Sequence, residues 1–126
     1  MKKVQIDLPE RGLIIRDPWV SLILSGKKSW ELRTRATTIR GRIAIIRAGS
    51  GLVIGEARLI DCLPKQNRWE LICGIPWHQV PRDQLDAAIE AGWVFPWVLE
   101  NAYRYRDPVP YKHPKGAVTW VDLTKY

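Results

Sequence analysis

The sequence predicts a mixed α+β fold, mostly β: a small curved sheet or β-barrel of five or six strands with two or three short helices. At 126 residues the chain has the length of one domain with one core. Short β-branched runs gather in the first half, and few segments have the apolar periodicity of a helix. A doubly wound parallel sheet does not fit, because crossover helices are too few and no glycine-rich phosphate motif is present.

The chain is expected to open with a strand and a short helix. Residues 11 to 16 form a β-branched run bounded by charge, which predicts the strand. Asp17 suits the N-cap of the helix, Pro18 its first position and Gly26 the left-handed residue after its last turn. Almost every residue between them is apolar, so this helix should be largely buried.

Three strands are predicted next, over residues 29 to 33, 42 to 48 and 52 to 63. The last two are joined through Gly49-Ser50-Gly51, a spacing typical of a hairpin. Gly55 lies inside the second strand of that hairpin, which indicates a bulge or a close approach of another backbone.

The second half is less regular. Three prolines between residues 64 and 81 leave no room for a long element, so this segment is predicted to be irregular. The remaining elements are expected to be a helix over about 82 to 91, a strand over 93 to 104, a loop over 108 to 114 and a closing strand over 117 to 123. Pro96 argues against a central position for the strand unless its missing donor faces outward.

Composition favours a cytosolic protein with no membrane association. No apolar run approaches the roughly 20 residues that span a bilayer, and Asp7 and Pro9 interrupt the region where a signal peptide would be apolar. Cys62 and Cys73 are expected to be free thiols, and with His78 they fit no common zinc spacing. We therefore expect no metal and no cofactor.

Positive charge is concentrated in one segment. The net charge is +7, and between residues 27 and 47 seven cations face only Glu31. The seven are Lys27, Lys28, Arg33, Arg35, Arg40, Arg42 and Arg47. Such a stripe suits a phosphate backbone, because each neutralised phosphate releases a condensed counterion. The alternative is a solvated basic surface with no ligand.

Residues 26 to 33, Gly-Lys-Lys-Ser-Trp-Glu-Leu-Arg, lie where the helix ends and the next strand begins. Strand alternation places Glu31 and Arg33 on one face and Trp30 and Leu32 on the other. A lysine beside a carboxylate can position a phosphate or an oxyanion, and partial burial lowers its pKa toward proton transfer. The alternative is an ion pair that closes one end of the barrel.

The pattern Gly-x-Lys-x-x-Glu-x-Arg resembles the signature of the ASCH family, whose fold is a β-barrel similar to the PUA domain. Here it is formed by Gly26, Lys28, Glu31 and Arg33. Further similarity lies at residues 13 to 19, 40 to 43, 55 to 57 and 116 to 120, so that the resemblance covers most of residues 11 to 63 and the tail. It implies a single PUA-like domain over residues 1 to 126. It also implies a cleft between the first helix and the barrel, and a role in RNA binding or RNA-associated chemistry.

The leading hypothesis is a module that binds single-stranded RNA or a modified nucleoside. Its predicted binding residues are Lys27, Lys28, Arg33, Arg35, Arg40 and Arg42, with Arg16 and Lys112 outside the stripe. In this hypothesis Glu31 accepts from a base edge, while Arg33 holds Glu31 or clamps a phosphate.

Two other classes remain open. One is a metal-independent enzyme at the same cleft with Lys28 and Glu31 as its catalytic pair, either a ribonuclease on single-stranded RNA or an amidohydrolase on N4-acetylcytidine. The hydrolase branch of the family carries threonine at the position of Glu31, so its mechanism does not transfer intact. The other is a protein-interaction domain, such as a transcription coactivator module, which exposed Trp93 or Trp97 would favour.

Aromatic and histidine positions have two interpretations each. Trp93, Phe95 and Trp97 share one face of a predicted strand and form either a base-stacking platform or, more commonly, core. The basic loop of residues 112 to 115 either reaches the same cleft or is solvated, and we expect it to be solvated. A ribonuclease with a histidine acid and base would need His113 and His78 together, and nothing in their spacing supports that pairing.

Overall fold

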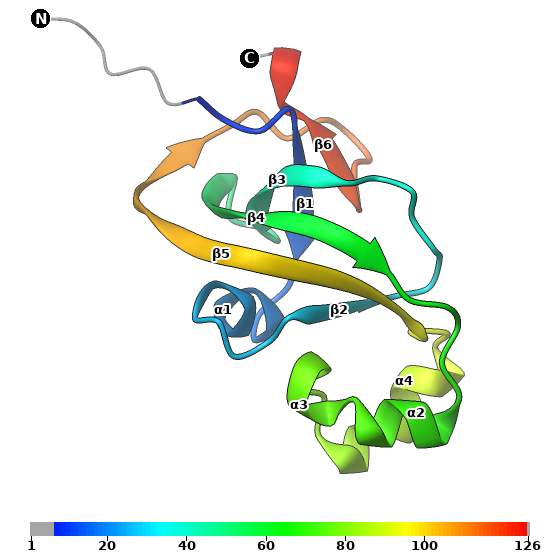
Figure 1. The fold of residues 1–126 in the computed structure, drawn as a ribbon. Coiled ribbons are helices and arrows are strands. Elements are labelled where there is room, and N and C mark those ends of the chain that lie inside the picture. The colour runs from blue at the N-terminus through cyan, green and yellow to red at the C-terminus, as the bar shows by residue number, and fades with distance from the viewer. Residues whose placement is uncertain (1–6, 126) are drawn as a thin grey trace, which may run out of the picture.

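The computed structural model describes residues 7–125, and these form the predicted α+β fold as a curled half-barrel (Figure 1). Its strands are β1 (Arg11–Ile15), β2 (Trp30–Arg33), β3 (Gly41–Arg47), β4 (Leu52–Cys62), β5 (Phe95–Pro110) and β6 (Trp120–Asp122). They form one sheet in the order β2-β5-β4-β3-β1-β6. Only β1 and β3 run parallel among these pairs; the others are antiparallel.

The helices are short and lie in two places. They are α1 (Trp19–Leu24), α2 (Arg68–Cys73), α3 (Ile75–His78) and α4 (Leu85–Glu90), with 3-10 turns over Arg82–Gln84 and Leu123–Lys125. In Figure 1, α1 lies beside β5 and β2, whereas α2, α3 and α4 gather beyond one end of the sheet. None of these helices is long and apolar enough to cross a membrane.

The first helix begins differently from the prediction. Pro18, not Asp17, occupies the N-cap position, and no side chain caps the helix. The Asp17 carboxylate instead accepts from Ser21 Oγ at 3.1 Å and pairs with Arg47 at 3.0 Å, so its oxygens serve the side chains around it. The predicted stop is confirmed, because Gly26 has a φ of +83°.

The β3-β4 hairpin is confirmed, and Gly55 has the close backbone approach that its position suggested. A Cβ atom at this residue would lie 2.3 Å from the carbonyl oxygen of Tyr103 and 2.7 Å from Leu24 Cδ2. The register between β4 and β5 shifts between Val53 and Gly55. Glycine therefore lets β5 and α1 pack directly against β4.

The prediction that residues 64 to 81 are irregular was wrong, because α2 and α3 lie there. Asn67 Oδ1 accepts from the backbone N–H of Glu70 at 2.8 Å, and Glu70 Oε1 accepts from the backbone N–H of Asn67 at 3.0 Å. This capping box starts α2. Pro76 lies in the first turn of α3, where proline is tolerated, so the prolines limit the helices to about one turn each without preventing them.

The strand β5 extends beyond the predicted 93 to 104 and replaces the first part of the loop expected over 108 to 114. It continues because Val109 and Pro110 pair with Val53 and Leu52 at the start of β4. Pro96 lies near the beginning of β5, opposite Leu32, before pairing with β4 starts at Trp97. The closing strand is shorter than predicted, with residues 120 to 122 in β6.

The core of the described residues has three parts: a main part inside the curled sheet, a second part under the helices, and a third part formed by Ala44, Ile46, Val53, Val121 and Leu123. The main part is formed by strands and by α1, and its buried residues include Leu13, Ile23, Ile45, Leu59 and Trp97. The second cluster consists of Leu32, Leu71, Val80, Leu85 and Val94. Leu32 of β2 therefore joins the sheet to the helical group. Cys62 and Cys73 are both free thiols, as predicted.

We predict that Gly55→Ala destabilises the protein by about 1–3 kcal/mol, because the added methyl group meets a backbone carbonyl that cannot rotate away. Urea unfolding followed by circular dichroism measures this change. Arg58→Ala, at an exposed position of the same strand, is the control and should stay within about 0.5 kcal/mol of wild type. Equal stability of the two variants would contradict the close approach.

Candidate functional site

A cleft of about 440 Å³ opens where the curled sheet fails to close on itself. The strands β2 and β6 are the two edges of the sheet, and the cleft lies between β2 on one side and β1 with the segment before β6 on the other. Its polar lining comes from Arg16, Lys28, Glu31, Arg33, Thr34, His113 and Thr119. Its apolar lining includes Ile14, Trp19, Leu32, Val80, Trp93, Ala117 and Val118.

Lys28 is buried in this cleft, with 2% of its surface exposed. The backbone N–H groups of Lys27 and Lys28 both donate to the carbonyl of Leu22, so the end of α1 fixes where the side chain departs. The Lys28 Nζ donates to the carbonyl of His78 at 2.5 Å and lies 4.9 Å from the centre of the Trp19 ring. The ammonium group is thus held by a backbone dipole and an aromatic face.

Burial lowers the pKa of Lys28 to about 8. The negative charge of Glu31 opposes this shift, and the positive charge of Arg33 adds to it. Glu31 Oε1 lies 3.8 Å from the ammonium, which is an ion-pair contact without a short hydrogen bond. Lys28 is therefore mostly charged at pH 7 and mostly neutral by pH 9.

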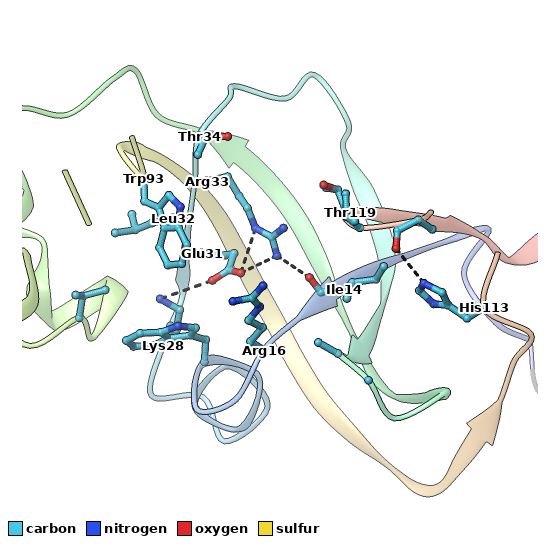
Figure 2. A pocket seen from close by; sticks show the side chains of 16 residues that line it. Ile14, Arg16, Lys28, Glu31, Leu32, Arg33, Thr34, Trp93, His113 and Thr119 are labelled. Atoms are coloured by element: carbon cyan, nitrogen blue, oxygen red, sulfur yellow. Dashed lines mark hydrogen bonds and ion pairs between the residues drawn. The ribbon is translucent and has the colours of Figure 1, made fainter. Parts of the chain in front are cut away.

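Arg33 joins the two sides of the cleft (Figure 2). Its Nη2 donates to Glu31 Oε2 at 2.8 Å and to the carbonyl of Ile14 in β1 at 2.8 Å, and its Nε donates to the same Glu31 oxygen at 3.2 Å. The bond to Ile14 crosses the gap between β2 and β1, which are not paired in the sheet. Glu31 uses Oε2 for this connection, while Oε1 faces Lys28.

Four of the predicted site residues meet in the cleft: Arg16, Lys28, Glu31 and Arg33. Arg16 is exposed. The other predicted binding residues, Lys27, Arg35, Arg40, Arg42 and Lys112, are exposed but are not part of the cleft lining. The basic stripe therefore divides into a cleft group and a peripheral group.

Arg42 is held in a second ion-pair cluster away from the cleft. Its Nε and Nη2 donate to the carboxylate of Glu56 at 2.6 and 2.9 Å, and its Nη2 also donates to the carbonyl of Asp7. Burial alone would raise the pKa of Glu56, but hydrogen bonds from Arg42 and Tyr105 outweigh burial and hold that pKa below its usual value. Arg42 thus links β3 to β4 as a structural residue.

The two histidines do not act as a pair. His78 is fully buried, its Nε2 lies 2.6 Å from the carbonyl of Leu71, and its Nδ1 accepts from the backbone N–H of Val80 at 2.9 Å. Both ring nitrogens are therefore engaged with the backbone. His113 lines the cleft instead of being simply solvated as expected. Its Nδ1 lies 2.8 Å from the Tyr111 hydroxyl.

Sequence reasoning missed the contribution of Thr34 and residues 117–119 to the cleft, and for His113 it favoured a solvated position over a place in the cleft. No local motif marks them. Thr34 directly follows Arg33 at the end of β2. Residues 117–119 reach the site because β6 pairs with β1, and because the backbone N–H of Ile14 donates to the carbonyl of Thr119. Only this strand order could have identified them.

The aromatic stripe does not form a shared stacking platform. Trp97 is 4% exposed and stacks inside the core on Trp120, with ring centres 5.8 Å apart, and Phe95 packs against the helical cluster. Trp93 lies just before β5, lines the cleft and is 37% exposed. The core interpretation is thus correct for two of the three rings, and the exposed part of Trp93 belongs to the cleft.

Within residues 7–125, no group of three His, Cys, Asp or Glu side chains is placed to hold a metal ion.

The sequence profile of the ASCH domain matches residues 13–108, which is more than half of the chain. The chain belongs to the ASCH domain family. Among solved structures, it is similar to an ASCH protein from Zymomonas mobilis, with 19% identity, a TM-score of 0.70 and coverage of 91% of this chain and 87% of that one. No curated protein matches the chain.

Two variants of that Zymomonas mobilis protein are similar to the same degree. In one a serine is replaced by alanine, with a TM-score of 0.69 and coverage of 88% of that chain. In the other a tyrosine is replaced by phenylalanine, with a TM-score of 0.70 and coverage of 90%. Each is 19% identical and covers 91% of this ASCH domain, so the likeness establishes the shared fold.

We predict that Glu31→Gln lowers the pKa of Lys28 below 8, because the carboxylate that favours the ammonium is removed. The pKa is measured by NMR titration of ¹³C-labelled lysine, with the Lys28 signal assigned by its loss in Lys28→Arg. Glu100→Gln, at an exposed position on β5, should leave the midpoint unchanged. A Lys28 midpoint that rises or stays constant in Glu31→Gln would show that the two groups are not coupled.

Proposed function

We propose that this ASCH domain binds single-stranded RNA and receives one unpaired nucleotide in the cleft between β2 and β1. The observation that carries the proposal is the buried Lys28 ammonium beside the Glu31 carboxylate in a cleft with apolar walls and an exposed arginine, Arg16. A ligand with a charged group, a polar base edge and a flat apolar face matches all three parts.

The dimensions of the cleft support a single nucleotide. About 440 Å³ is within the usual range of small-ligand pockets. A base in a duplex has its edges paired and its faces stacked, so it cannot enter a pocket of this kind without leaving the helix. Unpaired RNA offers its bases without that cost.

The charges of the cleft favour an anionic ligand. Arg16, Lys28 and Arg33 carry three positive charges against the single negative charge of Glu31. Arg33 is already occupied by Glu31 and Ile14, so Arg16 and Lys28 are the cations left for a phosphate. Arg16 is the better phosphate contact because it is exposed, whereas Lys28 is positioned for a group that enters the cleft.

The base would be recognised by Glu31 Oε1 and by the aromatic wall. Among residues 7–125 that oxygen has the 3.8 Å contact with Lys28 and no hydrogen bond, so it can accept from an amino group of a base. Trp93 is partly exposed in the lining and offers a face for stacking. Lys27, Arg35, Arg40 and Lys112 are exposed and remain candidates for phosphates that flank the bound nucleotide. The proposed location of this activity is the cytosol.

A second candidate function is catalysis at the same cleft, as a ribonuclease on single-stranded RNA or an amidohydrolase on N4-acetylcytidine. The observation that favours it is the pKa of Lys28, about 8, which allows a substantial neutral fraction near physiological pH. Neutral Lys28 can take a proton from a 2′-hydroxyl or from water, and its protonated form can stabilise an oxyanion. Glu31 would orient the attacking group through Oε1.

We predict that single-stranded RNA binds more tightly than duplex RNA, and that affinity falls as pH rises through about 8. The pKa of Lys28 is lowered, so the ammonium is present below pH 8 and is lost above it. Fluorescence titration at fixed salt measures both effects. Lys28→Met should weaken binding at least tenfold at pH 7 and remove the alkaline decline, because one buried charged contact is typically worth 1.4 kcal/mol or more.

Arg16→Ala and Arg106→Ala form the matched pair for this experiment. Both remove one exposed arginine, but only Arg16 lines the cleft. The first should lower the affinity several-fold more than the second. The proposal would be contradicted if Arg16→Ala and Arg106→Ala lowered the affinity equally and Lys28→Met left the salt dependence of binding unchanged. RNA binding would then be a diffuse electrostatic effect of the surface.

For the catalytic alternative, we predict turnover of single-stranded RNA or N4-acetylcytidine that Glu31→Gln and Lys28→Met each reduce at least 100-fold, because general acid–base catalysis contributes about 10²–10⁴-fold. Product formation is followed by chromatography with EDTA present. Activity should increase with pH as Lys28 becomes neutral if it acts as the base. Identical yields from wild type and both variants would reject catalysis at this cleft and leave binding as the function.

A further inference from the structure

The segment that ends α3 contacts the Lys28 region through two consecutive carbonyl groups. The carbonyl of Trp77 accepts from the backbone N–H of Ser29 at 2.9 Å, and the carbonyl of His78 accepts from Lys28 Nζ. The Trp77 ring also stacks on Trp30, with ring centres 5.2 Å apart. The position of the Lys28 ammonium therefore depends on how residues 77 and 78 are held.

The imidazole of His78 holds this segment from both sides. Its Nε2 reaches back to the carbonyl of Leu71 in α2, and its Nδ1 accepts from the N–H of Val80, two residues ahead. Gln79 lies between His78 and Val80. It has a left-handed backbone with φ of 63°, which turns the chain sharply after α3. The hydrogen bonds of the two His78 ring nitrogens, together with the left-handed turn at Gln79, fix the orientation of the His78 carbonyl.

We infer that His78 is the positioning residue of Lys28: its neutral imidazole clamps the turn at residues 78–80 so that the His78 carbonyl meets the ammonium inside the cleft. His78 does not line the cleft and would not touch the ligand. The inference concerns regulation of the same site and rests on the proposed function only where RNA affinity is the readout.

The chemistry of both ring nitrogens requires the neutral form with the proton on Nε2. Leu71 offers only a carbonyl acceptor and Val80 only an N–H donor, so a proton on Nδ1 would oppose the Val80 N–H. Burial lowers the pKa of His78, the bond to Leu71 opposes that shift, and the nearby charge of Lys28 adds to it.

The other charged groups near Lys28 are few. Glu31 and Arg33 on β2 act on the ammonium directly, and Arg16 after β1 lines the same cleft. In the described part of the chain, none of these groups forms a hydrogen bond or ion pair with the turn at residues 78–80. A change at His78 therefore acts on Lys28 through the carbonyl.

The test is the Lys28 midpoint in three variants, measured by NMR titration of ¹³C-labelled lysine without any RNA. His78→Leu removes both ring bonds, His78→Gln can keep only a donor toward Leu71, and His78→Asn can keep only an acceptor toward the Val80 N–H, as in an Asx turn. A carbonyl bond to an ammonium favours the charged form. His78→Leu and His78→Gln should therefore lower the midpoint by at least one unit, whereas His78→Asn should stay near 8.

RNA titration of the same variants separates the inference from the proposed function. A midpoint lowered from 8 to 7 reduces the charged fraction at pH 8 from about one half to about one tenth, so affinity at pH 8 should fall about fivefold. An unchanged midpoint in His78→Leu overturns the positioning role. A lowered midpoint with unchanged RNA affinity upholds that role and contradicts the use of Lys28 in binding.

The His78→Gln and His78→Asn pair keeps the test falsifiable if His78→Leu does not fold. Thermal unfolding establishes that both variants are folded at the titration temperature. A lower midpoint in His78→Gln than in His78→Asn supports the clamp at Val80, and equal midpoints overturn it.

Discussion

The guanidinium of Arg33 is the contact on which the site depends. The sheet curls until its edge strand β2 comes near β1, but no backbone ladder joins these two strands. Arg33 crosses that gap, with Glu31 on its own strand and the Ile14 carbonyl on the other. The Cζ atom of Arg33 also lies 5.6 Å from the ring centre of Trp97, so a buried aromatic ring of the core packs against the guanidinium. Because Arg33 crosses the gap between the unpaired strands β2 and β1, a cleft remains beside its side chain.

An ion pair that closes the barrel and the proposed ligand site are compatible here. The structural role belongs to the ion pair between Arg33 Nη2 and Glu31 Oε2, which are 2.8 Å apart. Glu31 Oε1 and Lys28 Nζ are 3.8 Å apart, a looser ion-pair contact on the cleft side of the carboxylate. Because the two functions use different oxygens of one carboxylate, a single acidic residue can both close the fold and present an acceptor to the cleft.

Local patterns predicted the elements whose causes are local. The β3-β4 hairpin follows from its glycine-rich connection, the end of α1 from Gly26, and the fit at Gly55 from a glycine within a strand. The helix α2 also had a local signal, since Asn67 and Glu70 form a capping box, but the nearby prolines were given more weight. Asp17 looked like an N-cap because the pattern of residue types cannot show that Arg47, thirty positions away, takes its carboxylate.

Apart from Arg16, the cleft residues that the sequence predicted lie on the side formed by one continuous segment. Lys28, Glu31 and Arg33 come from residues 26 to 33, where the end of a helix and the alternation of a strand fix their directions. The opposite wall comes from residues 117–119 and His113, and depends on β6 pairing with β1. For His78 the sequence suggested only a metal ligand or an acid or base, because no sequence pattern reveals that both its ring nitrogens bind backbone groups.

The basic stripe illustrates how folding changes the meaning of a charge count. Of the seven cations between residues 27 and 47, Arg33, Arg40, Arg42 and Arg47 are paired with carboxylates, and Lys28 is buried. Those carboxylates come from distant segments for all but Arg33, so the sequence window overstated the field at the surface. Fewer unpaired cations mean fewer displaced counterions and a weaker diffuse attraction for nucleic acid. Under the proposed function this gives more weight to the cleft, where a desolvated ammonium interacts more strongly than an exposed one.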